Sequence, residues 1–164
     1  MTSVLSELYR HNLWANLRLI DACAALPDET IDASIDGTLG SIRETFAHIA
    51  RAEAGYVVNV TRGEYPAPPG QPYAMADLRA WLQRSGEAMI AIAEETHEDR
   101  VWDVQWQGNL VPLPLSIVLT QVINHATDHR SQICTTLTQQ GVTPPDLQGW
   151  AYLDEQQRAS GVGS

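Results

Sequence analysis

Apolar side chains recur at steps of three and four residues along four long segments of the chain. This spacing places them on one face of a helix, so the pattern predicts four amphipathic helices. The predicted helices cover residues 3–26, 39–61, 75–97 and 115–140. Between the last two predicted helices, the spacing of the apolar residues changes. Residues 101–114 are rich in β-branched and aromatic side chains around Gln107-Gly108-Asn109, which predicts a small hairpin.

Turn-forming residues separate the predicted helices. Pro27 ends the first helix, and residues 28–38 are polar and rich in turn formers. Residues 62–73 hold four of the nine prolines, so they form a loop, and a short helix is expected at 149–159. The sequence therefore predicts an all-α fold. We expect a four-helix bundle with long crossover connections, a small hairpin before the last long helix and a short C-terminal helix, in one domain spanning 1–164.

Composition and charge narrow the possible partners. The chain has 164 residues, of which 44% are apolar, and a formal net charge of −10. Such an acidic chain is not expected to bind nucleic acid or anionic membranes, because both attract clustered Lys and Arg. It has no run of about 18 apolar residues and no signal peptide pattern. With Cys23 and Cys134 expected to be reduced thiols, a cytoplasmic protein is predicted.

Two histidines lie on the inner edge of the predicted fourth helix. On a helical wheel, His129 lies about 40° from His125, and both adjoin the apolar stripe that includes Val122. Gln121 and Gln132 lie on the other flank of the histidines. The four polar residues therefore form one column beside an apolar face. Histidines four positions apart on a helix can converge on one ion.

A third histidine has the same placement on the predicted second helix. His48 lies at the inner edge of that helix, with polar residues along its column. A single histidine in such a position is more often part of a core, and spacing alone does not bring His48 to the other pair. Together, however, His48, His125 and His129 could bind one divalent metal, zinc or nickel, and leave positions open for water or a substrate. An incomplete protein ligand set of this kind is typical of catalytic sites.

Several polar residues could support these ligands. Glu44 lies one turn before His48 and could contact it, or it could form a capping box with Ser41. Asp128 and Gln132 are the other candidates for a supporting role, and Asp128 could also act as an acid-base group. The sequence identifies no catalytic residue beyond these candidates.

Other chemically active side chains have simpler interpretations. Glu94 and His97 form half of a di-iron carboxylate motif, but no second Glu-x-x-His occurs, so a solvated helix end is predicted. His11 lies off the apolar stripe of the first helix and is expected to be exposed. Cys23 and Cys134 are expected to be small core residues.

Three segments resemble the DinB/YfiT-like family of metal-dependent enzymes. They are LYRHNLWANLRLI at 8–20, LGSIRETFAHIARAEAGYV at 39–57, and PLPLSIVLTQVINHATDHRSQICTTLTQQG at 112–141. The first is similar to the opening helix of the family, the second to its histidine-bearing second helix, and the third to its Asn-His-x3-His-Arg-x-Gln helix. The resemblance covers most of the chain in the same order and spacing.

The resemblance implies a four-helix bundle with a metal held by His48, His125 and His129. It also implies that homodimers are common. Two positions depart from the family pattern: Asp128 stands where a further histidine is frequent, and Ser131 where glycine is usual. Neither departure removes a ligand.

Two reaction classes and one non-catalytic role remain open. A metal of this kind could activate water for hydrolysis, or it could hold a low-molecular-weight thiol cosubstrate for S-transfer to a small molecule. The second reaction resembles the activity of family members on bacillithiol or mycothiol. The alternative is a metal- or ligand-binding protein with a stress-response role. A highly anionic substrate is disfavoured unless Arg51 or Arg130 faces the site.

Overall fold

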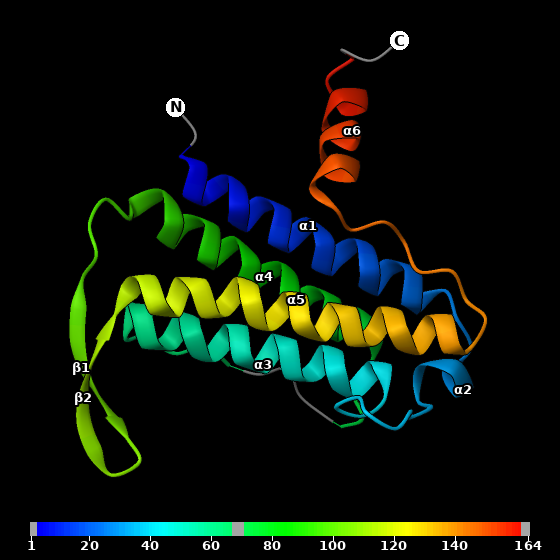
Figure 1. Cartoon of the computed structure of the whole chain (residues 1–164), viewed down its shortest axis with the longest axis horizontal. Helices are drawn as coiled ribbons and strands as arrows, with labels where there is room; N and C mark the ends of the chain where they lie inside the picture. The colour runs from blue at the N-terminus through cyan, green and yellow to red at the C-terminus, as the bar shows by residue number, and fades with distance from the viewer. Residues whose placement is uncertain (1–2, 67–70, 162–164) are drawn as a thin grey trace.

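The computed structural model describes residues 3–66 and 71–161, and most of them are helical (Figure 1). In chain order the elements are α1 (Val4–Ala24), α2 (Asp28–Ile31), α3 (Ile42–Thr61), α4 (Met75–Glu95), β1 (Val101–Trp106), β2 (Asn109–Pro114), α5 (Leu115–Gln139) and α6 (Gly149–Ala159). The predicted all-α fold, with a small hairpin before the last long helix and a short C-terminal helix, is confirmed. No helix in the described ranges combines the length and the apolar character that crossing a membrane requires.

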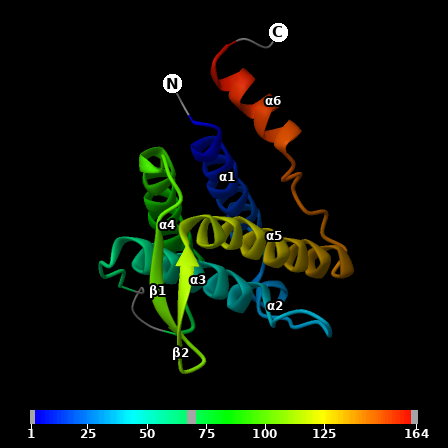
Figure 2. The same cartoon turned by 60° about the vertical axis from the view of Figure 1, so that its left-hand side comes forward.

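The four long helices form a bundle in which the neighbours are not all antiparallel. The helices α1 and α5 run in one direction, and α3 and α4 run in the other (Figures 1 and 2). Around the bundle, α1 packs against α4, α4 against α3, α3 against α5, and α5 against α1. Because α3 and α4 are parallel neighbours, the chain must return along the whole bundle between them. The connection between Thr61 and Met75 makes this return, so a crossover connection is confirmed.

That connection contains the predicted loop at 62–73. Residues 67–70 of this loop lie outside the described residues. The described remainder of the loop is neither helix nor strand, as predicted. The segment 28–38 differs from the expectation of turns alone, because α2 forms a single helical turn there. Its residue Ile31 is buried, and this apolar contact gives the short turn a reason to form.

The start of α3 is set by a capping box. The Ser41 hydroxyl accepts a hydrogen bond from the backbone N–H of Glu44 at 3.2 Å. In return, the Glu44 carboxylate accepts one from the backbone N–H of Ser41 at 2.8 Å. Ser41 has extended dihedral angles, so the helix begins at Ile42. The predicted start at residue 39 was wrong by three positions for this reason.

Apolar side chains from the four helices fill the bundle in two clusters. One cluster lies toward the end that holds α2 and includes Leu19, Phe46 and Leu82. The other includes Tyr9 and Leu119. Tyr9 also donates a hydrogen bond from its hydroxyl to the Leu119 carbonyl oxygen at 2.7 Å, which satisfies the buried phenol. The two clusters hold the bundle together along its length.

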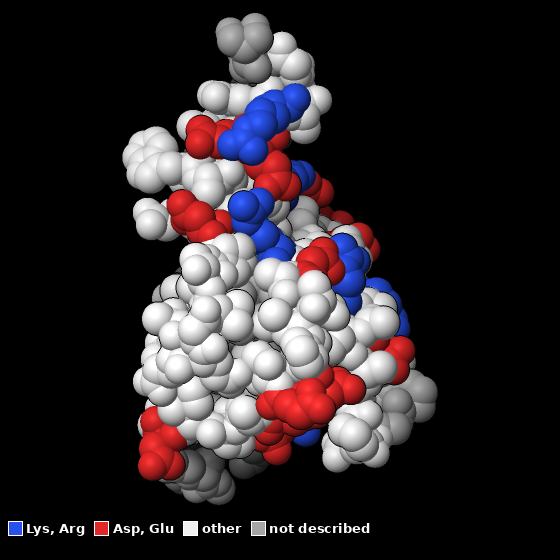
Figure 3. All heavy atoms as spheres, turned by 90° about the vertical axis from the view of Figure 1, so that its right-hand side faces the viewer, with Lys and Arg blue, Asp and Glu red and all other residues white. Residues whose placement is uncertain are grey.

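The hairpin and the last helix lie at the edges of the bundle. Strands β1 and β2 pair antiparallel from Val101 opposite Pro114 to Trp106 opposite Asn109, and the turn between them has positive φ angles, as two-residue hairpin turns require. Helix α6 projects away from the bundle beside α1 (Figures 1 and 2). In Figure 3, acidic and basic side chains gather around α6, above a broad uncharged area.

Candidate metal centre

Three histidine rings meet where α3 packs against α5. His48 comes from α3, and His125 and His129 come from successive turns of α5. The Nε2 atoms of His48 and His125 are 3.0 Å apart. The ring centroids of the three pairs lie 4.9, 4.6 and 4.5 Å apart. The structure therefore brings together the three histidines that the sequence singled out.

The spacing of the three rings suits a single divalent ion. One ligand nitrogen from each ring lies within 4.8 Å of the other two. A tetrahedral ion with metal–nitrogen bonds of about 2.0–2.1 Å places its nitrogen ligands about 3.4 Å apart. The observed separations bracket this value, so small side-chain rotations are enough to close the ligand set around an ion. The three histidines are positioned to bind a metal.

The site reaches the surface of the molecule. His48 and His125 are half-buried, whereas His129 is 8% exposed. Next to them, Val122 and Ala126 turn into the core and hold the histidine face of α5 against α3. Solvent therefore reaches the centre from the side of His48 and His125, while His129 lies toward the interior.

Burial and mutual repulsion lower the pKa of His48 and that of His125. Burial first, and then the neighbouring His129 and His48, lower the pKa of His125 to about 4, whereas the nearby Asp128 carboxylate opposes the shift. The pKa of His48 is also lowered, by burial first, then by His129 and Arg51. A neutral imidazole is the form that donates a lone pair to a metal. His48 and His125 are thus in the form that can bind a cation near neutral pH.

A glutamine fixes the orientation of the inner histidine. Gln132 Oε1 lies 3.2 Å from Nδ1 of His129 and also accepts the backbone N–H of Leu39 at 3.3 Å. Because an amide oxygen only accepts, Nδ1 carries the proton, and Nε2 of His129 keeps its lone pair for a metal. The amide nitrogen of Gln132 donates to Asp128 at 3.4 Å. Asp128 itself is exposed, and its hydrogen bond with Gln132 links it to His129.

The sequence left two roles open for Glu44, a contact with His48 or a capping box with Ser41. In the structure Glu44 forms the capping box. It is exposed and its carboxylate accepts the Ser41 N–H in the capping box of α3. Among the described residues, no hydrogen bond joins Glu44 to His48. Glu44 thus acts on His48 by starting the helix that carries it.

The two arginines near the site face different ways. Arg51 is exposed one turn after His48, where its charge lowers the pKa of that histidine. Arg130 follows His129 directly, yet it points into the bundle and is 5% exposed. It belongs to a buried cluster with Glu53 that the sequence analysis missed. The available signal was a glutamate inside the apolar stripe of the second helix.

His11 is not exposed, which corrects the sequence expectation. Its ring packs against Trp14 and Tyr152, with centroids 5.6 and 5.5 Å away, and its Nε2 lies 3.0 Å from the Leu147 carbonyl oxygen. The segment before α6 and α6 itself return to cover this part of α1. The apolar pattern of the first helix does not show that a later segment of the chain packs over it. Glu94 and His97 are exposed at the end of α4, as predicted.

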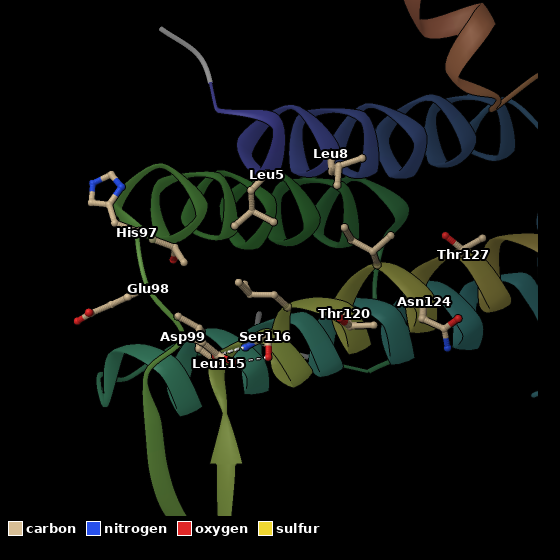
Figure 4. Close-up of a pocket in the computed structure, with 13 residues that line it drawn as sticks. Leu5, Leu8, His97, Glu98, Asp99, Leu115, Ser116, Thr120, Asn124 and Thr127 are labelled. Atoms are coloured by element: carbon tan, nitrogen blue, oxygen red, sulfur yellow. Dashed lines mark hydrogen bonds between the residues drawn. The ribbon is translucent and has the colours of Figure 1, made fainter.

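Several hollows lie along α3 and α5. One of about 680 Å³ lies between α1, the end of α4 and α5, and Leu5 and Leu8 are among the residues that line it (Figure 4). Its lining does not include the three histidines of the candidate centre. Another, of about 380 Å³, is lined in part by Ala47 and Arg51, which flank His48 on α3. The chemistry of the three histidines therefore belongs to the α3–α5 surface and not to the 680 Å³ hollow.

Comparison with known proteins covers nearly the whole chain. The sequence profile of the DinB family matches residues 1–160. Protein DinB of Bacillus subtilis (strain 168) is 20% identical over 172 residues, which span 97% of this chain and 100% of that protein. Both matches include the helices that carry the three histidines.

Proposed function

The chain belongs to the DinB family, and on that premise we propose that it is a divalent-metal-dependent enzyme. Its mononuclear site holds one zinc or nickel ion through His48, His125 and His129, since imidazole suits both metals. The observation that carries the proposal is the convergence of three histidine nitrogens within 4.8 Å on a half-exposed surface.

The protein residues have distinct tasks at this centre. The three imidazoles would bind the metal ion. Gln132 holds His129 in the tautomer whose unprotonated Nε2 can bind that ion. Three protein ligands leave a fourth tetrahedral position for a small molecule. A bound ion would lower the pKa of a water or thiol there and would polarise a carbonyl. Asp128, exposed beside the site, offers a carboxylate oxygen that can take up the released proton.

We propose that the reaction is S-transfer from a low-molecular-weight thiol of the bacillithiol or mycothiol type, or hydrolysis of a small molecule. The resemblance to thiol-using family members supports the first reaction. The open approach past His48 and His125 supports both, because a cosubstrate must reach the ligand set.

The alternative is a bundle that binds a metal or ligand without turnover and has a stress-response role. A sealed site would favour it, since storage does not require exchange with solvent. The half-exposed His48 and His125 favour the enzyme instead.

Metal analysis of the purified protein beside His129→Ala tests the centre. We expect about one zinc or nickel per wild-type chain and a large loss in the variant, because two imidazoles hold a divalent ion poorly. Equal metal content in the two proteins would refute the centre. The metal-loaded protein is then assayed for thiol transfer and for ester and amide hydrolysis. Turnover in one assay identifies the reaction class, and binding without turnover supports the alternative.

We further propose that the protein acts in the cytoplasm as a homodimer. Large apolar side chains are exposed on α1 and α6, among them Leu8 and Trp150, and burying them between two copies would be favourable. Sedimentation velocity over a range of concentrations tests this. A single species with the mass of one chain at all concentrations would refute the dimer.

A further inference from the structure

Behind the histidines, α3 and α5 carry charged residues that face the interior of the bundle. Glu53 follows His48 by five positions, and Arg130 follows His125 by five positions. Five residues of a helix correspond to a rotation of about 140° and a rise of about 7.5 Å. Each helix therefore presents a half-buried histidine near the surface and a charged residue in the interior, with the same offset.

Two asparagines of α1 join the two charges. Glu53 Oε1 accepts hydrogen bonds from the amide nitrogens of Asn12 at 3.0 Å and Asn16 at 3.1 Å. Arg130 donates from one nitrogen to the amide oxygens of both asparagines, at 2.7 Å each. Ser85 of α4 donates to Glu53 Oε2 at 2.7 Å. All four long helices thus contribute to one hydrogen-bonded cluster, which we call the inner cluster.

The inner cluster is buried, and its donors and acceptors match. Glu53 is 1% exposed and Arg130 is 5% exposed. All three partners of Glu53 donate to it, which is the pattern that an ionised carboxylate requires. Burial raises the pKa of Glu53, and the three donors and the charge of Arg130 oppose that rise. A buried ionic cluster of this kind is weak evidence for added stability, but its bonds can be made in only one arrangement.

We propose that the inner cluster positions the metal ligands by fixing the rotation of α3 and α5 about their own axes. The proposal rests on the metal centre of the proposed function. A rotation of about 15° moves a ring nitrogen, about 6 Å from the helix axis, by about 1.6 Å. Metal–nitrogen distances tolerate only about 0.2 Å. Apolar burial is non-directional, whereas the bonds of Glu53 and Arg130 to the same two amides have fixed directions.

The test exchanges the charged pair for apolar residues of similar size. The double variant Glu53→Leu with Arg130→Met leaves no unpaired buried charge, so we expect it to fold. Its Zn²⁺ affinity, measured by competition with a chelator, is expected to fall about 10–100-fold, as for loss of groups that orient ligands. The visible absorption of bound Co²⁺, which reports ligand geometry, is expected to change.

Leu78→Ala is the matched control. Leu78 is fully buried on α4, so the substitution opens a cavity and destabilises the bundle without removing a bond of the inner cluster. It should leave the Co²⁺ spectrum unchanged. If the double variant does not fold, Ser85→Ala takes its place, with a smaller expected loss of affinity.

The outcomes separate this proposal from the metal centre itself. The positioning role is overturned if the double variant keeps the wild-type Zn²⁺ affinity and the wild-type Co²⁺ spectrum. The same result in Ser85→Ala overturns it if the double variant does not fold. A control that changes the spectrum as much as the double variant also overturns it, because general loosening would then explain the effect. A wild-type protein that binds neither Zn²⁺ nor Co²⁺ overturns the proposed function.

Discussion

The two faces of the α3–α5 pair differ in how their polar side chains are buried and bonded. On the outer face, the Nε2 atoms of His48 and His125 approach to 3.0 Å, and both rings are partly exposed. On the inner face, Glu53 and Arg130 are almost fully buried and bonded to the same two asparagines. The outer residues bring ring nitrogens close to one another, whereas the inner residues satisfy one another.

This difference separates a ligand site from a scaffold on the same two helices. A buried charge requires its partners at all times, so removing one partner leaves a large desolvation cost. A neutral, half-exposed imidazole is hydrated when it binds nothing, so its removal costs the fold little. The outer face should therefore control metal binding, and the inner face should control the fold and the geometry of the ligands.

The largest expected effect is on stability when one inner charge is removed. Arg130→Ala leaves Glu53 without its countercharge, and we expect a loss of about 3–5 kcal/mol in the free energy of unfolding. His48→Ala, on the outer face, should change it by less than about 1 kcal/mol in the metal-free protein. Urea unfolding with chelator present measures both. Similar losses for the two variants would remove the distinction between the faces.

A second effect should appear in metal affinity alone. Gln132→Leu removes the acceptor for Nδ1 of His129, so the ring loses its preferred tautomer and orientation. We expect Zn²⁺ affinity to fall about 10–100-fold, or about 1.4–2.7 kcal/mol, with little change in metal-free stability. Gln121→Leu, an exposed glutamine on the same helix, is the control and should retain affinity. Equal effects at the two positions would mean that Gln132 does not orient His129.

The smallest expected effect is a pH dependence of the metal-free fold. The pKa of His125 is about 4 in the folded chain against an ordinary value of 6.5. Between these values the unfolded chain binds a proton that the folded chain does not, so stability is fully present above about pH 6.5 and falls toward pH 4. Partial exposure limits the effect to about 1 kcal/mol.

The comparison is between the wild type and His125→Asn, each unfolded in urea at about pH 7 and about pH 5 with chelator present. The wild type should lose more stability than the variant on acidification, because only the wild type carries this imidazole. Titrating groups that do not interact with His125, such as Glu53, cancel in the difference. An identical loss in both proteins would show that His125 titrates normally in the folded chain.

Much of the fold could be predicted because helices are local. Helical period and turn residues located the long helices, and the short helix predicted at 149–159 is α6 (Gly149–Ala159). The start of α3 was predicted at residue 39 instead of 42, although the capping residues Ser41 and Glu44 were recognised. Helix ends depend on the bonding of single backbone groups, which periodicity does not describe.

The candidate site was predictable on each helix but not between helices. Spacing placed His125 and His129 on one face of α5 and His48 at the inner edge of α3, because rotation per residue is a property of one helix. Only the tertiary structure decided which helix packs antiparallel against this face of α5, and that helix is α3. The meeting of the three rings depends on that contact.

The sequence by itself determined which residues can bind a metal, on which helical faces they lie and where the helices form, since these follow from residue type and local period. Only the tertiary structure decided that Arg130 turns inward to meet Glu53, that the segment before α6 covers His11, and that His48 reaches its partners. The physical reason is that burial, charge pairing and ligand convergence depend on residues of other helices, distant along the chain, which local patterns do not specify.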